Sequence, residues 1–147
     1  MHCILYGVES PIRRNERLVL QDDLTETVST HRIDREMSQF STLLDQVNQL
    51  TMPRHFPRQL TLAAQIISEL IRIHPYPDGN GRVARMTVNL AFRKWSLPYV
   101  AIPKVRNSER WKSALHKGIT GDWSSAREFL DQLLHKSLRS YEEQFCH

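Results

Sequence analysis

The most informative stretch of this chain, residues 74–85, reads HPYPDGNGRVAR. An apolar helical pattern runs up to Ile73 and stops there, because the proline after His74 disfavours the αR conformation at that histidine. We expect His74 to be extended, with its imidazole pointing away from the helix end. Glycines on both sides of Asn80 permit positive φ or a close backbone approach, and a second helical pattern follows at once. The segment therefore predicts two helices joined by a short polar turn.

The turn has the features of a phosphate-binding site. Backbone N–H groups at Gly79, Asn80 and Gly81 would converge with the positive end of the second helix's macrodipole. Arg82 and Arg85 share a face of that helix's first turn, where two positive charges are unfavourable unless an anion lies nearby. The sequence therefore predicts that these residues bind the phosphates of a nucleotide.

Two further side chains supply chemistry for attack at phosphorus. Asp78 adjoins the turn, where a carboxylate oxygen can hold Mg²⁺ that bridges phosphate groups. His74 can accept the proton of an incoming hydroxyl, because histidine is largely neutral at pH 7. Such a general base contributes roughly 10² to 10⁴ in rate. The side chain of Asn80 and the N–H groups of the loop are expected to stabilise the charge that develops on the α-phosphate.

Each of these residues also has an ordinary structural explanation. Asp78 could cap the second helix, His74 could be a solvent residue at a helix end, and residues 79–81 could be a simple turn. The segment is not a Walker loop, because no Gly-Lys-Ser/Thr follows, and no strand pattern precedes it as in a dinucleotide fingerprint. A catalytic zinc on His74 and Asp78 is an alternative that lacks a third ligand at a recognisable spacing. The combination favours nucleotide chemistry.

The order His-Pro-aromatic, Asp-Gly-Asn-Gly-Arg and a last Arg three residues on resembles the signature of the Fic family. The usual leaving group in that family is pyrophosphate, which implies that Arg82 and Arg85 neutralise the β- and γ-phosphates of ATP, with Mg²⁺ on Asp78. The resemblance implies a protein adenylyltransferase that moves AMP from ATP to a Ser, Thr or Tyr hydroxyl. His74 would be its general base, and the implied partner is a target protein that carries the hydroxyl.

Other donors and other functions stay open. Members of the family also use UTP, a CDP-linked group or the γ-phosphate of ATP, and contacts to the base cannot be placed from one sequence. The intact Gly81-Arg82 pair favours the usual nucleotide orientation, since the phosphotransferring relatives depart from the motif there. The alternative from another class is a nucleotide-binding regulator or nucleic-acid adaptor without catalysis. The intact His74 argues against it, because a binding module has no use for a presented base.

Composition indicates one soluble domain over residues 1–147. Of the 147 residues, 40% are hydrophobic and 24% charged, which is ordinary for a globular protein. The net charge is +4, but 20 basic residues are offset by 16 acidic ones. They form no continuous basic tract, so we do not expect a nucleic acid partner. No run approaches the length of a membrane span and no signal peptide is visible. Cys3 and Cys146 are expected to be reduced thiols in the cytoplasm, although a secreted effector acting in a host cytosol is an alternative.

Helical periodicity covers residues 33–145 and predicts a mainly α fold. The resemblance implies that this fold is a Fic-like helical bundle. The first helix is expected to start at Ile33 and end before Pro53, and the second to start near Pro57 and lead to His74. The third follows the turn, ends before Ser96 and precedes an extended stretch at residues 99–102. Asn107 or Ser108 can cap a fourth helix, and Asp122 or Ser124 a fifth. Apolar stripes are expected to be core. In the third helix the stripe comprises Val83, Met86 and Leu90, and in the fifth Ala126, Phe129, Leu130, Leu133, Leu134, Leu138, Tyr141 and Phe145.

The N-terminal part, at about residues 11–32, has a β-prone pattern. Two β-prone runs flank the polar stretch 21–26 and are consistent with a small hairpin. In Fic proteins a flap hairpin lies at this position and holds the target peptide by adding a strand to its edge. An irregular arm is the alternative. The residues that the resemblance assigns to target binding are Leu18, Val19, Leu20, Thr27, Val28 and Ser29.

Many Fic proteins also carry an inhibitory helix, Ser/Thr-x-x-x-Glu followed by Gly or Asn, whose glutamate occupies the last motif arginine. Only Glu128 has a serine four residues before it, Ser124, and Phe129 follows, so the pattern is incomplete. We expect Ser124 to be a helix cap and Glu128 a solvated side chain. The enzyme would then be unrestrained, or inhibited by a separate protein that supplies a glutamate to Arg85, as in Fic toxin and antitoxin pairs.

Overall fold

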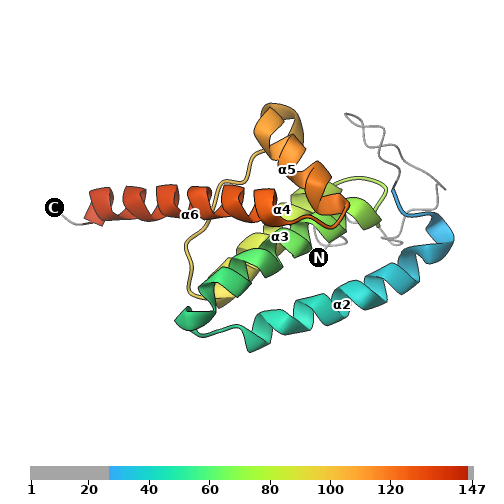
Figure 1. The fold of residues 1–147 in the computed structure, drawn as a ribbon, viewed down its shortest axis with the longest axis horizontal. Coiled ribbons are helices and arrows are strands. Elements are labelled where there is room, and N and C mark those ends of the chain that lie inside the picture. Colours follow the sequence, from blue (N-terminus) through green and yellow to red (C-terminus); the bar gives the residue numbers. More distant parts are fainter. Residues whose placement is uncertain (1–26, 146–147) are drawn as a thin grey trace.

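The computed structural model describes residues 27–145, which form helices joined by short turns, with no strand among them (Figure 1). The α-helices are α2 (Ile33–Gln49), α3 (Phe56–Ile73), α4 (Asn80–Lys94), α5 (Glu109–Ile119) and α6 (Ser124–Phe145). Short 3₁₀ turns precede three of them: η1 (Thr30–Arg32), η2 (Pro53–His55) and η3 (Val105–Asn107). The predicted mainly α class is therefore confirmed. No helix of the described residues combines the length and the apolar composition needed to cross a membrane.

Helix α3 is the centre of the packing, since it contacts α2, α4, α5 and α6. Eleven of its 18 residues are buried, which leaves a polar face with Arg58, Gln65 and Glu69 on the less buried side. Pro57 lies in the first turn, where no backbone N–H is needed. The side chains of Ile66 and Ile67 are 0% and 1% exposed, and each contributes about 1.5–3 kcal/mol through burial. The central helix thus gives a rigid support to the residue that follows it, His74.

Side-chain contacts tie the other helices together and confirm the predicted start of α5. The indole Nε1 of Trp95, directly after α4, donates to the Val47 carbonyl oxygen of α2 at 2.9 Å. Ser108 is the N-cap of α5, and its Oγ accepts from the Trp111 N–H at 3.2 Å. The Trp111 ring stacks on Phe129 of α6, with centroids 4.8 Å apart. These contacts join α4 to α2 and α5 to α6.

The helices were predicted correctly, but part of the expected core is exposed. Met86 and Leu90 of α4 are 40% and 47% exposed, because α4 turns a different face, including Val88 and Phe92, toward α3. In α6 the buried residues all lie in the first half of the helix: Ala126, Leu130 and Leu134. The second half projects past the other helices (Figure 1). The stripe of Leu138, Tyr141 and Phe145, expected to face inward, is therefore exposed.

The second strand of the expected hairpin is not present. Thr27, Val28 and Ser29 have no regular secondary structure, and η1 begins at the next residue. Thr27 and Val28 are instead buried, and the Val28 N–H donates to the Arg72 carbonyl oxygen at 3.3 Å. The β-prone character of this run thus reflects an extended segment packed against the end of α3. The other expected flap residues, Leu18, Val19 and Leu20, lie outside the described residues, as do Cys3 and Cys146.

Candidate active site

His74 lies directly after the last residue of α3. Its backbone has φ 50° and ψ 55°, a left-handed conformation, so the expectation of an extended backbone was wrong. The following Pro75 disfavours αR, and the left-handed region lets the His74 N–H donate to the Leu70 carbonyl oxygen at 3.0 Å. A non-glycine residue in this region costs about 1–3 kcal/mol and is typical of functional sites. His74 is half-buried, with Nδ1 itself buried.

The side chain of Asn80 closes the loop between α3 and α4. It is 3% exposed, its Nδ2 donates to the Tyr76 carbonyl oxygen at 2.8 Å, and its Oδ1 accepts from the Tyr76 N–H at 3.0 Å. These two bonds satisfy both backbone polar groups of Tyr76 within the loop. Asn80 therefore has a structural role that the sequence did not indicate. A contact with phosphate remains a prediction that could use only the second N–H of Nδ2.

The two glycines serve different purposes. Gly79, the N-cap of α4, has φ 80°, which is unfavourable for other residues. Its carbonyl oxygen accepts from the Val83 N–H at 3.0 Å and so starts the helix. Gly81 does not have positive φ, but a Cβ built there would lie 3.2 Å from Nη1 of Arg85. Gly81 therefore allows the guanidinium of Arg85 to lie against the first turn of α4, where the backbone N–H groups have no helical acceptor.

Arg82 and Asp78 lie at the exposed side of the turn. Nη2 of Arg82 is 3.4 Å from Oδ2 of Asp78, and the side chains are 57% and 83% exposed. An ion pair this exposed contributes little, about 0–1 kcal/mol, so an anion or cation can separate the two side chains at small cost. Among the described residues, no three His, Cys, Asp or Glu side chains gather as a metal site. One exposed carboxylate matches the way Mg²⁺ is held by a single protein ligand together with phosphates and water.

A group of charged side chains anchors the end of α3 just before His74. Glu36 of α2 is only 6% exposed and accepts from Nη2 of Arg72 and, at 3.0 Å, from Nη2 of Arg32. Arg72 also donates to Oε2 of Glu69, from Nε at 3.0 Å and from Nη2 at 2.7 Å. The hydrogen bond from Arg72 is the main reason why the pKa of Glu36 lies below its ordinary value. The cluster joins α2 to the last turn of α3.

This cluster was missed in the sequence, although a signal was present. Glu36 stands three residues after Ile33 and four before Phe40, so it falls on the buried face of α2. A carboxylate on such a face must find a cationic partner. Arg72, 36 positions away, could not have been identified as that partner from periodicity alone.

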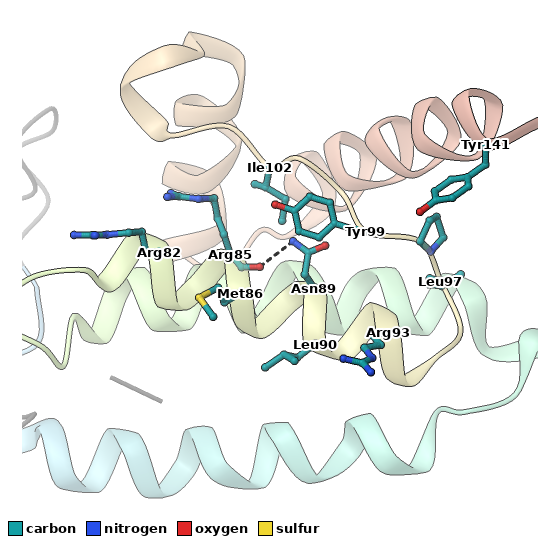
Figure 2. A pocket seen from close by; sticks show the side chains of 11 residues that line it. Arg82, Arg85, Met86, Asn89, Leu90, Arg93, Leu97, Tyr99, Ile102 and Tyr141 are labelled. Carbon is teal, nitrogen blue, oxygen red and sulfur yellow. Dashed lines mark hydrogen bonds between the residues drawn. The ribbon is translucent and has the colours of Figure 1, made fainter. Parts of the chain in front are cut away.

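A groove of about 620 Å³ runs along the outer face of α4 (Figure 2). Figure 2 shows Arg82 and Arg85 toward one end and Tyr141 of α6 at the other. Asn89 fixes the opposite wall, because its Nδ2 donates to the Val100 carbonyl oxygen at 3.1 Å and its Oδ1 accepts from the Val100 N–H at 2.8 Å. The groove is lined by Arg82, Arg85, Met86, Asn89, Leu90, Arg93, Leu97, Pro98, Tyr99, Ile102 and Tyr141.

The glycine-framed turn, the histidine before it and the arginines after it lie within a sequence region that matches a known family. Residues 11–92, more than half of the chain, match the Fic/DOC family. The chain belongs to the Fic/DOC family. A solved structure of Fic-1 (aa134–508) from C. elegans has the same fold, with a TM-score of 0.75 at 22% identity, over 97% of this chain and 41% of that chain. The predicted Fic-like helical bundle is therefore confirmed.

Two curated relatives of this Fic/DOC chain are named as transferases. A uridine 5'-monophosphate transferase of Xanthomonas campestris pv. campestris (strain 8004) is 35% identical over 63 residues, which are 43% of this chain and 12% of that protein. Protein adenylyltransferase fic-1 of Caenorhabditis elegans is 39% identical over 54 residues, 37% of this chain and 10% of that protein. The matched stretches thus span about a tenth of these relatives.

Proposed function

We propose that this chain is a Fic-type nucleotidyltransferase that moves AMP from ATP to a Ser, Thr or Tyr hydroxyl of a target protein. One observation carries the proposal: the turn between α3 and α4 puts His74 at one end and a glycine-framed helix N-terminus, with the Arg85 guanidinium against it, at the other. A base and an anion site on two buried helices are the parts that attack at phosphorus needs. The relative named adenylyltransferase supports this choice.

In the proposed reaction, His74 accepts the proton of the target hydroxyl. Nε2 is the nitrogen that would do so, because Nδ1 is buried. The hydroxyl oxygen then forms a bond to the α-phosphorus, and the bond from that phosphorus to the β-bridging oxygen breaks, so pyrophosphate leaves. The N–H groups of residues 79–81 and the positive end of α4 would stabilise the added charge on the α-phosphate. Arg82 and Arg85 would neutralise the leaving pyrophosphate.

Mg²⁺ would be held by Asp78 together with phosphate oxygens and water. Its contribution would be positive charge on the phosphates, as in other phosphoryl and nucleotidyl transfers. Asp78 would have to leave its 3.4 Å contact with Arg82. The carboxylate would then contact the nucleotide through the cation, and the guanidinium of Arg82 would contact it directly. Each charge would have a stronger partner than in the exposed ion pair.

A second donor, UTP, has support of its own. The relative named as a uridine 5'-monophosphate transferase is 35% identical over 63 residues. The residues proposed above contact only phosphates and the hydroxyl, so they would serve either nucleotide. Base selection would come from side chains outside the turn.

Labelled nucleotides separate these functions. The protein is incubated with Mg²⁺ and a cell lysate, together with ATP labelled at the α- or the γ-phosphate or UTP labelled at the α-phosphate, with His74→Ala as control. We expect label from α-labelled ATP on protein and a loss of roughly 10²- to 10⁴-fold in the variant. Transfer from UTP alone would show that UTP, and not ATP, is the donor. Transfer of the γ label would show that the reaction is phosphoryl transfer. An undiminished signal in the His74→Ala variant would refute the mechanism.

We also propose a cytoplasmic site of action, and that the chain is either unrestrained or inhibited by a separate protein that supplies a glutamate to Arg85. Glu128 has a different neighbour, since its Oε1 lies 3.7 Å from Nη2 of Arg110 and both side chains are more than half exposed. Ser124 donates through its N–H and Oγ to Oδ1 of Asp122 at the start of α6. If the purified protein were inactive alone and became active when Glu128 was replaced by glycine, inhibition from within the chain would be indicated instead.

A further inference from the structure

The exposed large hydrophobic side chains of the described residues are concentrated on one part of the surface. Met86, Leu90, Tyr99 and Tyr141 line the groove beside α4. The positions of Leu138, Tyr141 and Phe145 put them on one face of α6, and the rings of Tyr141 and Phe145 stack with centroids 6.0 Å apart. Patches of this kind on a soluble protein mark interaction sites.

The second half of α6 is only loosely packed against the described part of the chain, with Tyr141 at the edge of the groove. Residues 135–145, here called the α6 tail, include no buried residue, and Figure 1 shows this end of α6 extending beyond the bundle. A helix of this length is marginal in water unless an apolar face packs against something. The tail therefore has an apolar face that the described residues leave largely open.

The tail and the groove are complementary in chemistry. The groove is mainly apolar, and its wall carries the exposed guanidinium of Arg93. The tail presents its apolar stripe together with Lys136 and Arg139 in its first half and two carboxylates, Glu142 and Glu143, in its last turns, so only its end is acidic. Tyr141 belongs to both surfaces, since it is part of the stripe and lines the edge of the groove. The tail and the groove are therefore two complementary surfaces that adjoin on the same chain.

We propose that two copies of this chain form a two-fold symmetric dimer in which the α6 tail of each copy lies in the groove of the other. Two-fold association needs one self-complementary patch. Half-exposed side chains of this size lose roughly 100 Å² each on burial. With three from the tail and three from the groove in each copy, the total is on the order of 1,200 Å², at the lower end of stable interfaces. Arg82 and Arg85, proposed to bind phosphates, lie toward one end of the groove, but the contact uses the apolar side chains beside them, so this inference does not depend on the proposed reaction.

Sedimentation velocity of the whole chain tests the dimer. We expect a concentration-dependent dimer in the micromolar range, as interfaces of modest area often give. Phe145→Asp in the tail and Leu90→Asp in the groove should each weaken it by at least tenfold, because a charge is desolvated in the contact. Met52→Asp, at another exposed hydrophobic residue outside the groove, is the matched control and should leave it unchanged. Circular dichroism verifies that each variant is folded.

Mixing the two variants distinguishes tail-in-groove contact from other modes. In a mixture of Phe145→Asp and Leu90→Asp, the intact tail of one chain can occupy the intact groove of the other. We therefore expect a heterodimer, weaker than the wild-type dimer, where neither variant dimerises alone. A wild type that is monomeric throughout, a dimer that both variants leave intact, or a mixture without heterodimer would overturn the proposal.

Discussion

Replacing Gly81 with alanine is expected to separate stability from activity. The added Cβ would lie 3.2 Å from Nη1 of Arg85, a few tenths of an ångström too close. The far end of an arginine side chain can move by that amount, so the fold should tolerate the change. Alanine inside a helix is more favourable than glycine by roughly 0.5–1 kcal/mol. We therefore expect the free energy of unfolding to be unchanged or to rise by up to about 1 kcal/mol.

The effect of Gly81→Ala on transfer should be the opposite. The guanidinium of Arg85 would be pushed from the first turn of α4, where we propose that it meets the leaving pyrophosphate. A displacement of 1 Å at a reacting site can cost about 10²-fold in rate, so for a shift of a few tenths of an ångström we expect kcat/KM to fall by roughly 3-fold to 10-fold. Urea denaturation and transfer of the α-label are measured on the same preparations. Ser113→Ala, an exposed serine-to-alanine change in α5, controls for helix propensity.

A double-mutant cycle tests whether Gly81 acts through Arg85. If the only harm of the added methyl group is the displaced guanidinium, Gly81→Ala should have almost no further effect once Arg85→Ala is present. Losses that multiply would mean that the methyl group blocks the phosphates directly. Undiminished activity in Gly81→Ala would refute the placement of Arg85 in the proposed site.

Two further substitutions test the supports of the turn. Glu36→Gln should lower the free energy of unfolding at pH 7 by about 1–3 kcal/mol, because Arg72 loses a charged partner in a poorly hydrated position. The pKa of Glu36 is below its ordinary value of 4.5 in the folded protein, so this contribution is present above that pH and is lost as the pH falls through the folded pKa. Denaturation of both proteins at neutral and acid pH should therefore show a difference that shrinks on acidification, and a constant difference would contradict this origin. Asn80→Ala removes both hydrogen bonds to Tyr76, so amide exchange at Tyr76 should accelerate and stability should fall by about 1–3 kcal/mol; unchanged exchange would show that the loop is held by other contacts.

The sequence was sufficient where structure depends on local chemistry. Pro57, Pro75 and the glycine at position 79 impose backbone restrictions that act within a few residues, and they marked the ends of α3 and the start of α4. Ser108, one of the two candidate caps with Asn107, marked the start of α5 in the same way. The candidate site could be located for this reason, since it is one continuous segment between two helix ends.

What the sequence did not reveal depends on choices between several allowed partners or conformations. Pro75 disfavours αR at His74, but extended and left-handed conformations are both still allowed. The hydrogen bond from the His74 N–H to the Leu70 carbonyl oxygen favours the left-handed one. The side-chain amide of Asn80 could have bound either a ligand or the backbone of the loop. It binds the backbone of Tyr76, which is only four residues away. Glu36 needed a cation, but its main partner comes from another helix. These outcomes depend on tertiary packing, which local patterns do not contain.

The errors in the expected core are themselves informative about the surface. Helical periodicity identifies a face that should be buried, but it does not say against what. The residues expected inside and found exposed are Met86, Leu90, Leu138, Tyr141 and Phe145. Three lie on α6, two on α4, and Tyr141 belongs to the groove that Met86 and Leu90 line. Had periodicity failed at random, the errors would be scattered over all five helices. Their concentration on one surface is the pattern expected if this face is a core that needs a second copy of the chain to complete it.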